Sequence, residues 1–280
     1  MPEGHTLHRL AADLNAIFTG TDVRASSPQG RFADSAALID ALAYRTGHAH
    51  GKHLFVGFGP PAGTPGGDDF ESDHWVHIHL GLIGSLTFTP LALPRGAVRL
   101  RLANDDIAAD LRGPQVCQLV TTDEMVARMA ELGPDPLRAD ADPERGWRRV
   151  HASSKPVAAL LMDQRVLSGV GNVYRAEVLF RNRINPFRPG KLLNRRRWRE
   201  IWSDLLELMP QGMRANRIDT VRPEHTPEAM GRSQRVDDHG GEVYVYRRSG
   251  LPCHVCGSMI RTQVLEGRNL FWCGRCQRRG

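Results

Sequence analysis

The sequence contains no apolar run long enough to cross a membrane, because no stretch approaches the roughly eighteen residues that a membrane-spanning helix needs. Its first residues include histidines, an arginine and an aspartate where a secretory signal would have an apolar core. We therefore expect a cytoplasmic protein without a membrane partner. Lysine is also scarce, since the 37 basic residues include only Lys52, Lys155 and Lys191. Because arginine is effectively never deprotonated, each lysine is a candidate for a role that arginine cannot perform.

The charge that is present is divided unevenly along the chain. Residues 1–145 carry 12 basic and 19 acidic side chains (net −7), whereas residues 146–280 carry 25 basic and 12 acidic ones (net +13). One-sided positive charge is typical of a nucleic-acid-binding region, and a general role in solubility is the alternative. With 41% hydrophobic and 24% charged residues, the chain has the composition of a folded globular protein.

The chain begins with "MPEG", which places a proline and a glutamate directly behind the initiator. Removal of Met1 would leave Pro2 with a secondary amine, which is a nucleophile. Apolar residues recur at three- and four-residue steps over 7–18 and predict a helix, with Thr6 as its N-cap. The positive end of the helix dipole would then lie beside Pro2 and Glu3. A solvated tail is the alternative interpretation.

Short alternating apolar runs between about residues 52 and 119 predict the strands of a β-sandwich or barrel. The stretch "ELGPDPL" predicts a linker, and helical periodicity follows it. One predicted helix has Ser154 as its cap and Pro156 in its first turn. The helical stretches are 154–169, a segment that begins after Asn172, and 195–209. The region 219–242, rich in proline, glycine, histidine and charge, is predicted to be a mobile loop.

Four of the five cysteines form two Cys-x-x-Cys pairs with sixteen residues between them: Cys253, Cys256, Cys273 and Cys276. This spacing predicts a tetrahedral zinc site with four thiolate ligands, and disulfides are the weaker alternative in a cytosolic chain. Four protein ligands leave no open coordination position, so one structural zinc ion is expected. It would organise a hairpin whose turn, "EGRN", presents Arg268. The fifth cysteine, Cys117, is predicted to be a buried core residue.

His77 and His79 are spaced to share one face of a strand and offer a second, weaker metal-site hypothesis, because no third ligand lies nearby in the sequence. The alternative interpretation is that both histidines are structural.

Taken together, several segments resemble the formamidopyrimidine-DNA glycosylase and endonuclease VIII family, and within it the actinobacterial type of endonuclease VIII. The matching segments are "MPEG", "GKHLF", "HLGLIGSL", "LGPDPL", "LLMDQRVLSGVGNVYRAEVLF" and "CHVC" with "GRNLFWCGRC". The resemblance implies an α+β fold. Its parts would be an N-terminal β-sandwich flanked by helices (1–130), a helical domain with a helix-two-turn-helix motif (131–246) and a four-cysteine zinc finger (247–280), with DNA in the cleft between them.

The resemblance also implies roles for single residues. Pro2 would attack the sugar of a damaged nucleotide, and Glu3 would act as general acid and base. Lys52 would protonate the leaving group or bind a flanking phosphate, and Arg268 would hold the phosphates beside the extruded nucleotide. Asn172 would cap a motif helix and bind a phosphate. Two further DNA contacts are expected. Leu82 would be the wedge that fills the gap left by the extruded nucleotide, and Lys155 would contact the DNA backbone.

The implied function is a bifunctional DNA glycosylase and abasic-site lyase of base excision repair. A monomer acting on double-stranded DNA with an oxidised base or abasic site, associated with the nucleoid, is expected. The purine-directed branch carries an Arg-Arg-Phe run where this chain reads "DLRGPQ", which favours oxidised pyrimidines. The pyrimidine branch often carries Gln-Leu-Tyr where this chain reads "GLI", so the other void-filling groups are not identified. The alternatives are an oxidised-purine glycosylase and a non-catalytic zinc protein that binds damaged DNA.

Overall fold

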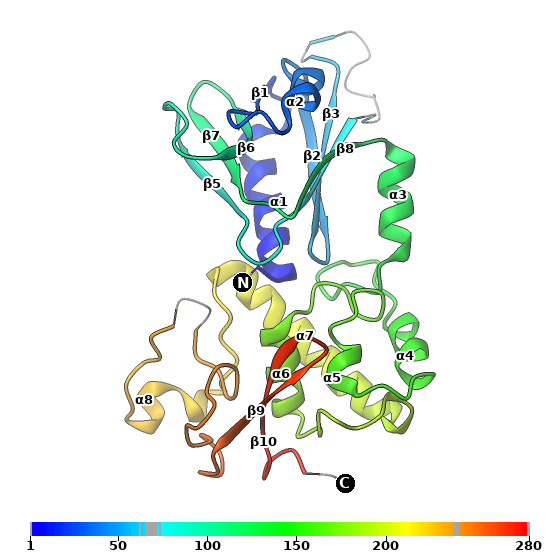
Figure 1. The fold of residues 1–280 in the computed structure, drawn as a ribbon, viewed down its shortest axis with the longest axis vertical. Coiled ribbons are helices and arrows are strands. Elements are labelled where there is room, and N and C mark those ends of the chain that lie inside the picture. The colour runs from blue at the N-terminus through cyan, green and yellow to red at the C-terminus, as the bar shows by residue number, and fades with distance from the viewer. Residues whose placement is uncertain (1, 62, 65–71, 73, 238–240, 279–280) are drawn as a thin grey trace. The chain divides into compact units, whose positions relative to one another are not determined.

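The computed structural model describes residues 2–61, 63–64, 72, 74–237 and 241–278 (Figure 1). Met1, whose removal would expose the amine of Pro2, lies outside the described residues. The chain separates into two compact units, Met1–Glu131 and Leu132–Gly280. The boundary predicted at residues 246 and 247, within the second unit, stays a prediction.

The first unit is a sandwich of two antiparallel four-stranded sheets. One sheet has the order β2 (Ala43–His50), β3 (His53–Gly59), β4 (His74–His79) and β8 (Val116–Val120). The other has the order β1 (Arg24–Ser26), β6 (Val98–Ala103), β7 (Ile107–Arg112) and β5 (Ser85–Pro90). Its helices are α1 (Gly4–Phe18), α2 (Ala33–Ile39) and α3 (Thr122–Glu131).

Strand β3 explains how the sandwich is filled. Its alternate residues Leu54, Val56 and Phe58 belong to one core that also contains apolar residues of the second sheet and of α1. Phe55 points to the opposite face, where it packs with Trp75 and residues including Met125 of α3. The predicted β-sandwich flanked by helices is therefore confirmed, and the fold is of the α+β class. In Figure 1, α1 runs between the two sheets.

Helix α1 begins earlier than the sequence predicted. Glu3 is the N-cap, with extended backbone, and the backbone N–H of Thr6 donates to the carbonyl oxygen of Glu3 at 2.9 Å. Thr6 therefore lies inside the first turn, and its assignment as the cap was wrong. Gly4 and His5 are both buried, so tertiary packing extends the helix beyond the point at which its apolar periodicity begins.

The second unit is built around α6 (Asn172–Arg181), of which Asn172 through Phe180 are all buried. The other regular elements are α4 (Pro143–His151), α5 (Val157–Leu160), α7 (Arg195–Ala215), α8 (Pro227–Met230), the 3₁₀ turns Gly190–Leu192 and Pro223–His225, and the hairpin β9 (Ile260–Leu265) and β10 (Arg268–Cys273). One hydrophobic core contains residues of α6, α7 and the hairpin. The predicted helices after Asn172 and over 195–209 are confirmed.

The helix predicted over 154–169 was wrong, since only the four residues of α5 are α-helical. Its cap is Pro156 and not Ser154. Gln164 explains the difference, because its side-chain amide donates to the carbonyl oxygens of Met162 and Val170 and accepts from the N–H of Gly169. These bonds replace helical ones with a compact turn, which apolar spacing cannot reveal.

A buried carboxylate connects α6 to the segment that precedes the hairpin. Glu177 is fully buried and accepts hydrogen bonds from the N–H groups of Tyr244, Val245 and Tyr246 at 2.7–2.9 Å, and from the hydroxyl of Thr220 at 2.6 Å. Because all these bonds end on one side chain, they fix the segment before the hairpin to the middle of α6.

The segment predicted to be a mobile loop, 219–242, contains one 3₁₀ turn and the short helix α8. Its described part is tied internally: Arg232 pairs with Glu242 at 2.6 Å, and Glu242 also accepts the N–H of Arg235 at 2.6 Å. Residues 238–240 lie outside the described part. Among the described residues, no helix has the length and apolar character required to span a membrane.

Candidate functional site

Pro2 and Glu3 lie at the start of α1. Pro2 is half-buried, and Glu3 is 0% exposed. Within the described helix, the Glu3 carboxylate makes no capping hydrogen bond although the residue occupies the N-cap position. A buried carboxylate is costly unless it is paired or hydrogen-bonded, and full burial of Glu3 contradicts the solvated-tail interpretation for this residue.

His5 follows in the first turn, and burial lowers its pKa to about 4, with a smaller contribution from positive charges such as Arg9. Its imidazole is therefore neutral at pH 7. A neutral side chain here adds no positive charge to the surroundings of Glu3 and Pro2.

The start of α1 lies at the same end of the first unit as the β2–β3 turn. Phe18 and Tyr44 are in contact at 6.0 Å between ring centroids, and the Asn15 amide donates to the carbonyl oxygen of Gly47 at 2.8 Å. From Asn15 to the beginning of the helix the rise is about 16 Å. From Gly47 to the turn, four or five strand residues span roughly 13–17 Å. The start of α1 and the β2–β3 turn therefore lie at the same end of the sandwich, as Figure 1 shows.

Lys52 occupies that turn. The two-residue loop joins His50 to His53, and Gly51 has a φ of 61°, which is typical of a type II′ hairpin. Burial lowers the pKa of His79, and the positive charge of Lys52 lowers it further. The turn thus holds a lysine at the end of the unit where Pro2 and Glu3 lie.

Leu82 lies in the β4–β5 turn, which also belongs to this end because His79 pairs with His53. The N–H of Gly84 donates to the carbonyl oxygen of Leu80 at 3.0 Å and closes the turn. Leu82 is 53% exposed and its neighbour Ile83 is 87% exposed. The turn therefore presents two adjacent apolar side chains to solvent, and sequence analysis identified only the first.

His77 and His79 do not form the metal site considered from their spacing. His77 hydrogen-bonds His53 at 2.8 Å between ring nitrogens, and Nδ1 of His79 accepts from the N–H of Gly81 at 3.1 Å. Within the described parts of the chain, the only group of three or more potential ligands that meets in space is formed by the four cysteines. His53, His77 and His79 instead form a packed cluster on the outer face of the sheet.

This cluster predicts acid sensitivity. Burial, aided by neighbouring positive charges, lowers the pKa of His53 to about 3 and that of His77 to about 4. Below about pH 6.5 the unfolded chain therefore takes up protons that the folded chain does not, and stability falls as the pH drops towards 4, by up to about 1.4 kcal/mol per pH unit for each such group. His77→Phe is expected to flatten the fall in melting temperature between pH 6.5 and 4.

The control for this experiment is His74→Phe, at the start of the same strand and outside the cluster. An equally steep acid dependence in wild type and His77→Phe would contradict the assignment.

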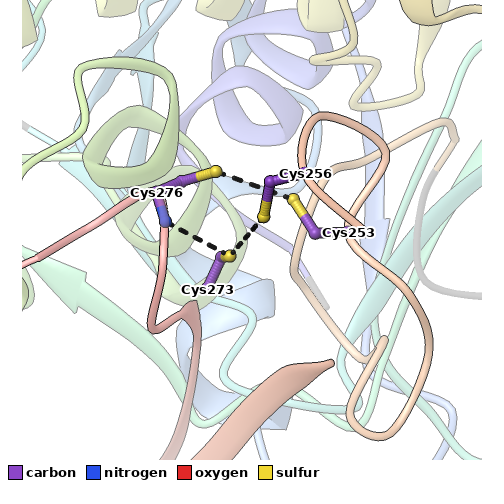
Figure 2. Close-up of side chains that lie close together, drawn as sticks. All are labelled: Cys253, Cys256, Cys273 and Cys276. Carbon is purple, nitrogen blue, oxygen red and sulfur yellow. Dashed lines mark hydrogen bonds between the residues drawn. The ribbon is translucent and has the colours of Figure 1, made fainter. Parts of the chain in front are cut away.

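The four cysteines meet in space (Figure 2). All four Sγ atoms lie within 4.8 Å of one another, with 3.9 Å between Cys253 and Cys276 and 3.5 Å between Cys256 and Cys273. Zinc–sulfur bonds of about 2.3 Å in tetrahedral geometry place neighbouring sulfurs about 3.8 Å apart. The donor set fits a zinc ion, and four thiolates would leave no position open for a substrate. The fifth cysteine, Cys117, is half-buried against the core of the first unit.

The four-cysteine cluster adjoins the β9–β10 hairpin, because Cys273 ends β10. Arg268 begins β10 and pairs with Leu265 across a two-residue turn, Glu266 and Gly267. The side chain of Arg268 lines a hollow of about 400 Å³ in the second unit. The other charged residues that line it are Lys155, Asp163, Arg165, Arg175 and Glu266. Arg268 and Lys155, 113 positions apart in sequence, thus line one basic hollow.

Asn172 is the first residue of α6 and not its cap, which is Gly171. Its side-chain amide donates to the carbonyl oxygen of Asn269 at 3.0 Å, and its oxygen accepts from Arg175. Capping by Asn172 was therefore a wrong expectation, because its side chain connects α6 to the hairpin. Through Arg175 it helps to shape the hollow.

Four charged residues of the hollow were missed by sequence analysis: Asp163, Arg165, Arg175 and Glu266. Arg175 could have been found, because it follows Asn172 by three residues and shares its helix face. The other three lack a local signal, since their position depends on contacts between the α5 turn and the hairpin.

Two family models match parts of the second unit. The formamidopyrimidine-DNA glycosylase H2TH domain matches residues 132–222, and a zinc finger found in FPG and IleRS matches residues 250–279. They cover the helical region and the four cysteines, respectively.

The chain is similar to known proteins over nearly its whole length. It is 48% identical to endonuclease 8 1 of Mycobacterium tuberculosis, over 99% of this chain and 100% of that one. It is 30% identical to formamidopyrimidine-DNA glycosylase of Methylococcus capsulatus over 99% of both chains. Among solved structures, it shares its fold with the Lactococcus lactis formamidopyrimidine-DNA glycosylase bound to DNA containing an AP site (TM-score 0.77, 19% identity, 99% and 100% of the chains).

Proposed function

Since the chain belongs to the endonuclease VIII and formamidopyrimidine-DNA glycosylase family of base-excision-repair enzymes, we propose that it removes oxidised pyrimidines from double-stranded DNA and then cleaves the abasic site by β,δ-elimination. The proposed monomer contains one structural zinc ion and acts at the nucleoid. The preference for pyrimidines rests on the "DLRGPQ" segment, which lacks the run of the purine-directed branch.

Pro2 is the proposed nucleophile. Its secondary amine attacks C1′ of the damaged nucleotide, the glycosidic bond breaks, and the base leaves with the bonding electron pair. A secondary amine has no second proton to lose after this attack, so opening of the sugar gives a cationic iminium directly. That iminium withdraws electrons and favours elimination of the phosphates.

Glu3 and Lys52 are the proposed proton-transfer groups. Glu3 protonates the ring oxygen when the sugar opens and later accepts the proton removed from the sugar during elimination. Lys52 protonates the departing group or binds the phosphate next to it. General acid–base catalysis requires such groups within reach of the reacting atoms. The position of the start of α1 and of the β2–β3 turn at the same end of the first unit supports this assignment.

The hollow of the second unit is proposed to bind DNA phosphates. Arg268 would hold those beside the extruded nucleotide, and Lys155 would bind the backbone as a point charge. Asn172 would act through Arg175 and the hairpin instead of as a helix cap. In the first unit, Leu82 and Ile83 are proposed to fill the space that the extruded base leaves in the duplex.

One observation carries the proposal: Glu3 is fully buried at the N-cap of α1, and the start of this helix lies at the same end of the first unit as the turn that contains Lys52. A carboxylate, a lysine and, once Met1 is removed, the amine of Pro2 at one end of one unit are the groups that the chemistry needs.

Activity on a panel of single-lesion duplexes tests the substrate class. An oxidised pyrimidine, such as thymine glycol or 5-hydroxycytosine, should be released about ten-fold or more faster than 8-oxoguanine, the range that pocket contacts provide. β,δ-Elimination should leave phosphate on both sides of the gap. Faster release of 8-oxoguanine would favour the purine-directed function instead, and cleavage that stops after β-elimination would contradict the lyase assignment.

A further inference from the structure

The turn of the β9–β10 hairpin contains a residue that the turn itself does not favour. Glu266 has a φ of 45° and Gly267 a φ of 73°, so both central residues are left-handed, as in a type I′ turn. The first position of such a turn favours asparagine, aspartate or glycine. Glutamate there is unusual, so turn formation does not explain the choice of residue.

The carboxylate of Glu266 reaches a distant lysine. Its Oε1 lies 3.0 Å from Nζ of Lys155, with both side chains more than half exposed. Ion pairs this exposed stabilise a fold very little. Stability therefore does not explain the pair either.

The pair lies in the basic hollow of the second unit. Of the other cations there, Arg165 pairs with Asp163, and Arg175 is held by Asn172. Glu266 thus neutralises the lysine in a hollow where Arg268 is also exposed. A carboxylate bound to an ammonium group in such a place has the charge and hydrogen-bonding capacity of a phosphate oxygen.

We infer that Glu266 is an internal competitor for the DNA backbone: its carboxylate occupies, at Lys155, the place of a phosphate and weakens DNA binding in the hollow. This inference rests on the proposed function, because it takes the ligand of the hollow to be a DNA phosphate. A phosphate that reaches Lys155 has to displace Glu266 and then lies beside its negative charge. Lys155 is already neutralised by the protein, so its binding to DNA releases no net counterion.

The salt dependence of DNA binding separates this role from a structural one. Kd for a short undamaged duplex is measured across a salt series for wild type and Glu266→Gln. The variant should bind about five-fold more tightly at low salt, the effect of one unit charge at contact distance in water. The slope of the logarithm of its association constant against the logarithm of the salt concentration should steepen by about 0.9, because one further cation exchanges its counterion for a phosphate.

Lys155→Gln provides the second arm. In the wild-type background it should change the slope little, and in the Glu266→Gln background it should remove the added steepness. Glu228→Gln, an equal charge change on α8 outside the hollow, is the matched control. Glu266→Asn, which suits the turn better, should repeat the result if charge and not turn geometry is responsible. Zinc content of each variant verifies that the hairpin is intact.

The outcomes are distinguishable. Wild type that binds no duplex at any salt would contradict the proposed function and this inference with it. Wild type that binds, together with an unchanged slope in Glu266→Gln, would overturn the inference alone. The same holds if the gain persists fully after Lys155 is replaced.

Discussion

A Pro2→Gly variant is expected to form at least about a hundred-fold less covalent product with abasic DNA in the presence of borohydride than the wild-type protein does. A loss of this size is in the range that removal of a positioned catalytic group produces. Borohydride reduces an iminium or imine to a stable amine, so the trapped product reports a covalent bond between an amine of the protein and C1′. Glycine keeps an amine at the terminus, but a primary one without the constraint of the ring.

A second variant isolates the amine from the rest of the residue. One extra residue placed before Pro2 leaves its ring in the chain but ties its nitrogen into a peptide bond. This variant should still bind a duplex that contains an uncleavable abasic analogue, and it should not trap. Binding by the wild type without any trapped product would support the non-catalytic reading of the protein. Full trapping by the extended chain would show that another nucleophile is responsible.

The second large effect is expected from the zinc site. Cys273→Ser should lower the zinc content to well below one ion per chain, because structural zinc sites in small domains derive about 10–16 kcal/mol from a complete ligand set. Cys273 is fully buried and ends the strand that begins with Arg268. Loss of the ion should therefore disorder the hairpin and reduce DNA binding and cleavage together, as measured by metal analysis, a binding assay and a nicking assay.

Cys117→Ser is the matched control, since Cys117 lies in the other unit and outside the cluster. It should keep its zinc and its activity. Unchanged cleavage by a Cys273→Ser protein verified to lack metal would contradict the role given to the hairpin and to Arg268.

Much of this architecture could be read from the sequence because the signals are local. The spacing of Cys253, Cys256, Cys273 and Cys276 predicted their convergence, since two short knuckles joined by a hairpin bring the pairs together. Alternating apolar residues predicted the sandwich, and helical periodicity predicted α6 and α7. These patterns depend on neighbours a few positions apart, and a sequence displays such neighbours directly.

Side chains that bind backbone at a distance set the limits of that prediction. Gln164 ends the helical region after α5, and Glu177 fixes residues 244–246 from the middle of α6. Asn172 looked like a helix cap, but it bridges α6 and the hairpin. In each case a polar group has several partners of similar energy, and only the folded chain decides which of them is within reach.

The sequence by itself determined the cluster of four cysteines, the adjacent Pro2 and Glu3, and the kind of fold, because spacing and residue chemistry are properties of the chain. The tertiary structure alone decided that Glu3 is buried, that His77 bonds His53, and that Glu266 reaches a lysine 111 positions away. Burial and long-range pairing depend on which surfaces meet when the chain folds. The sequence therefore determines which charged residues are present, whereas the fold determines which of these charges are buried or paired.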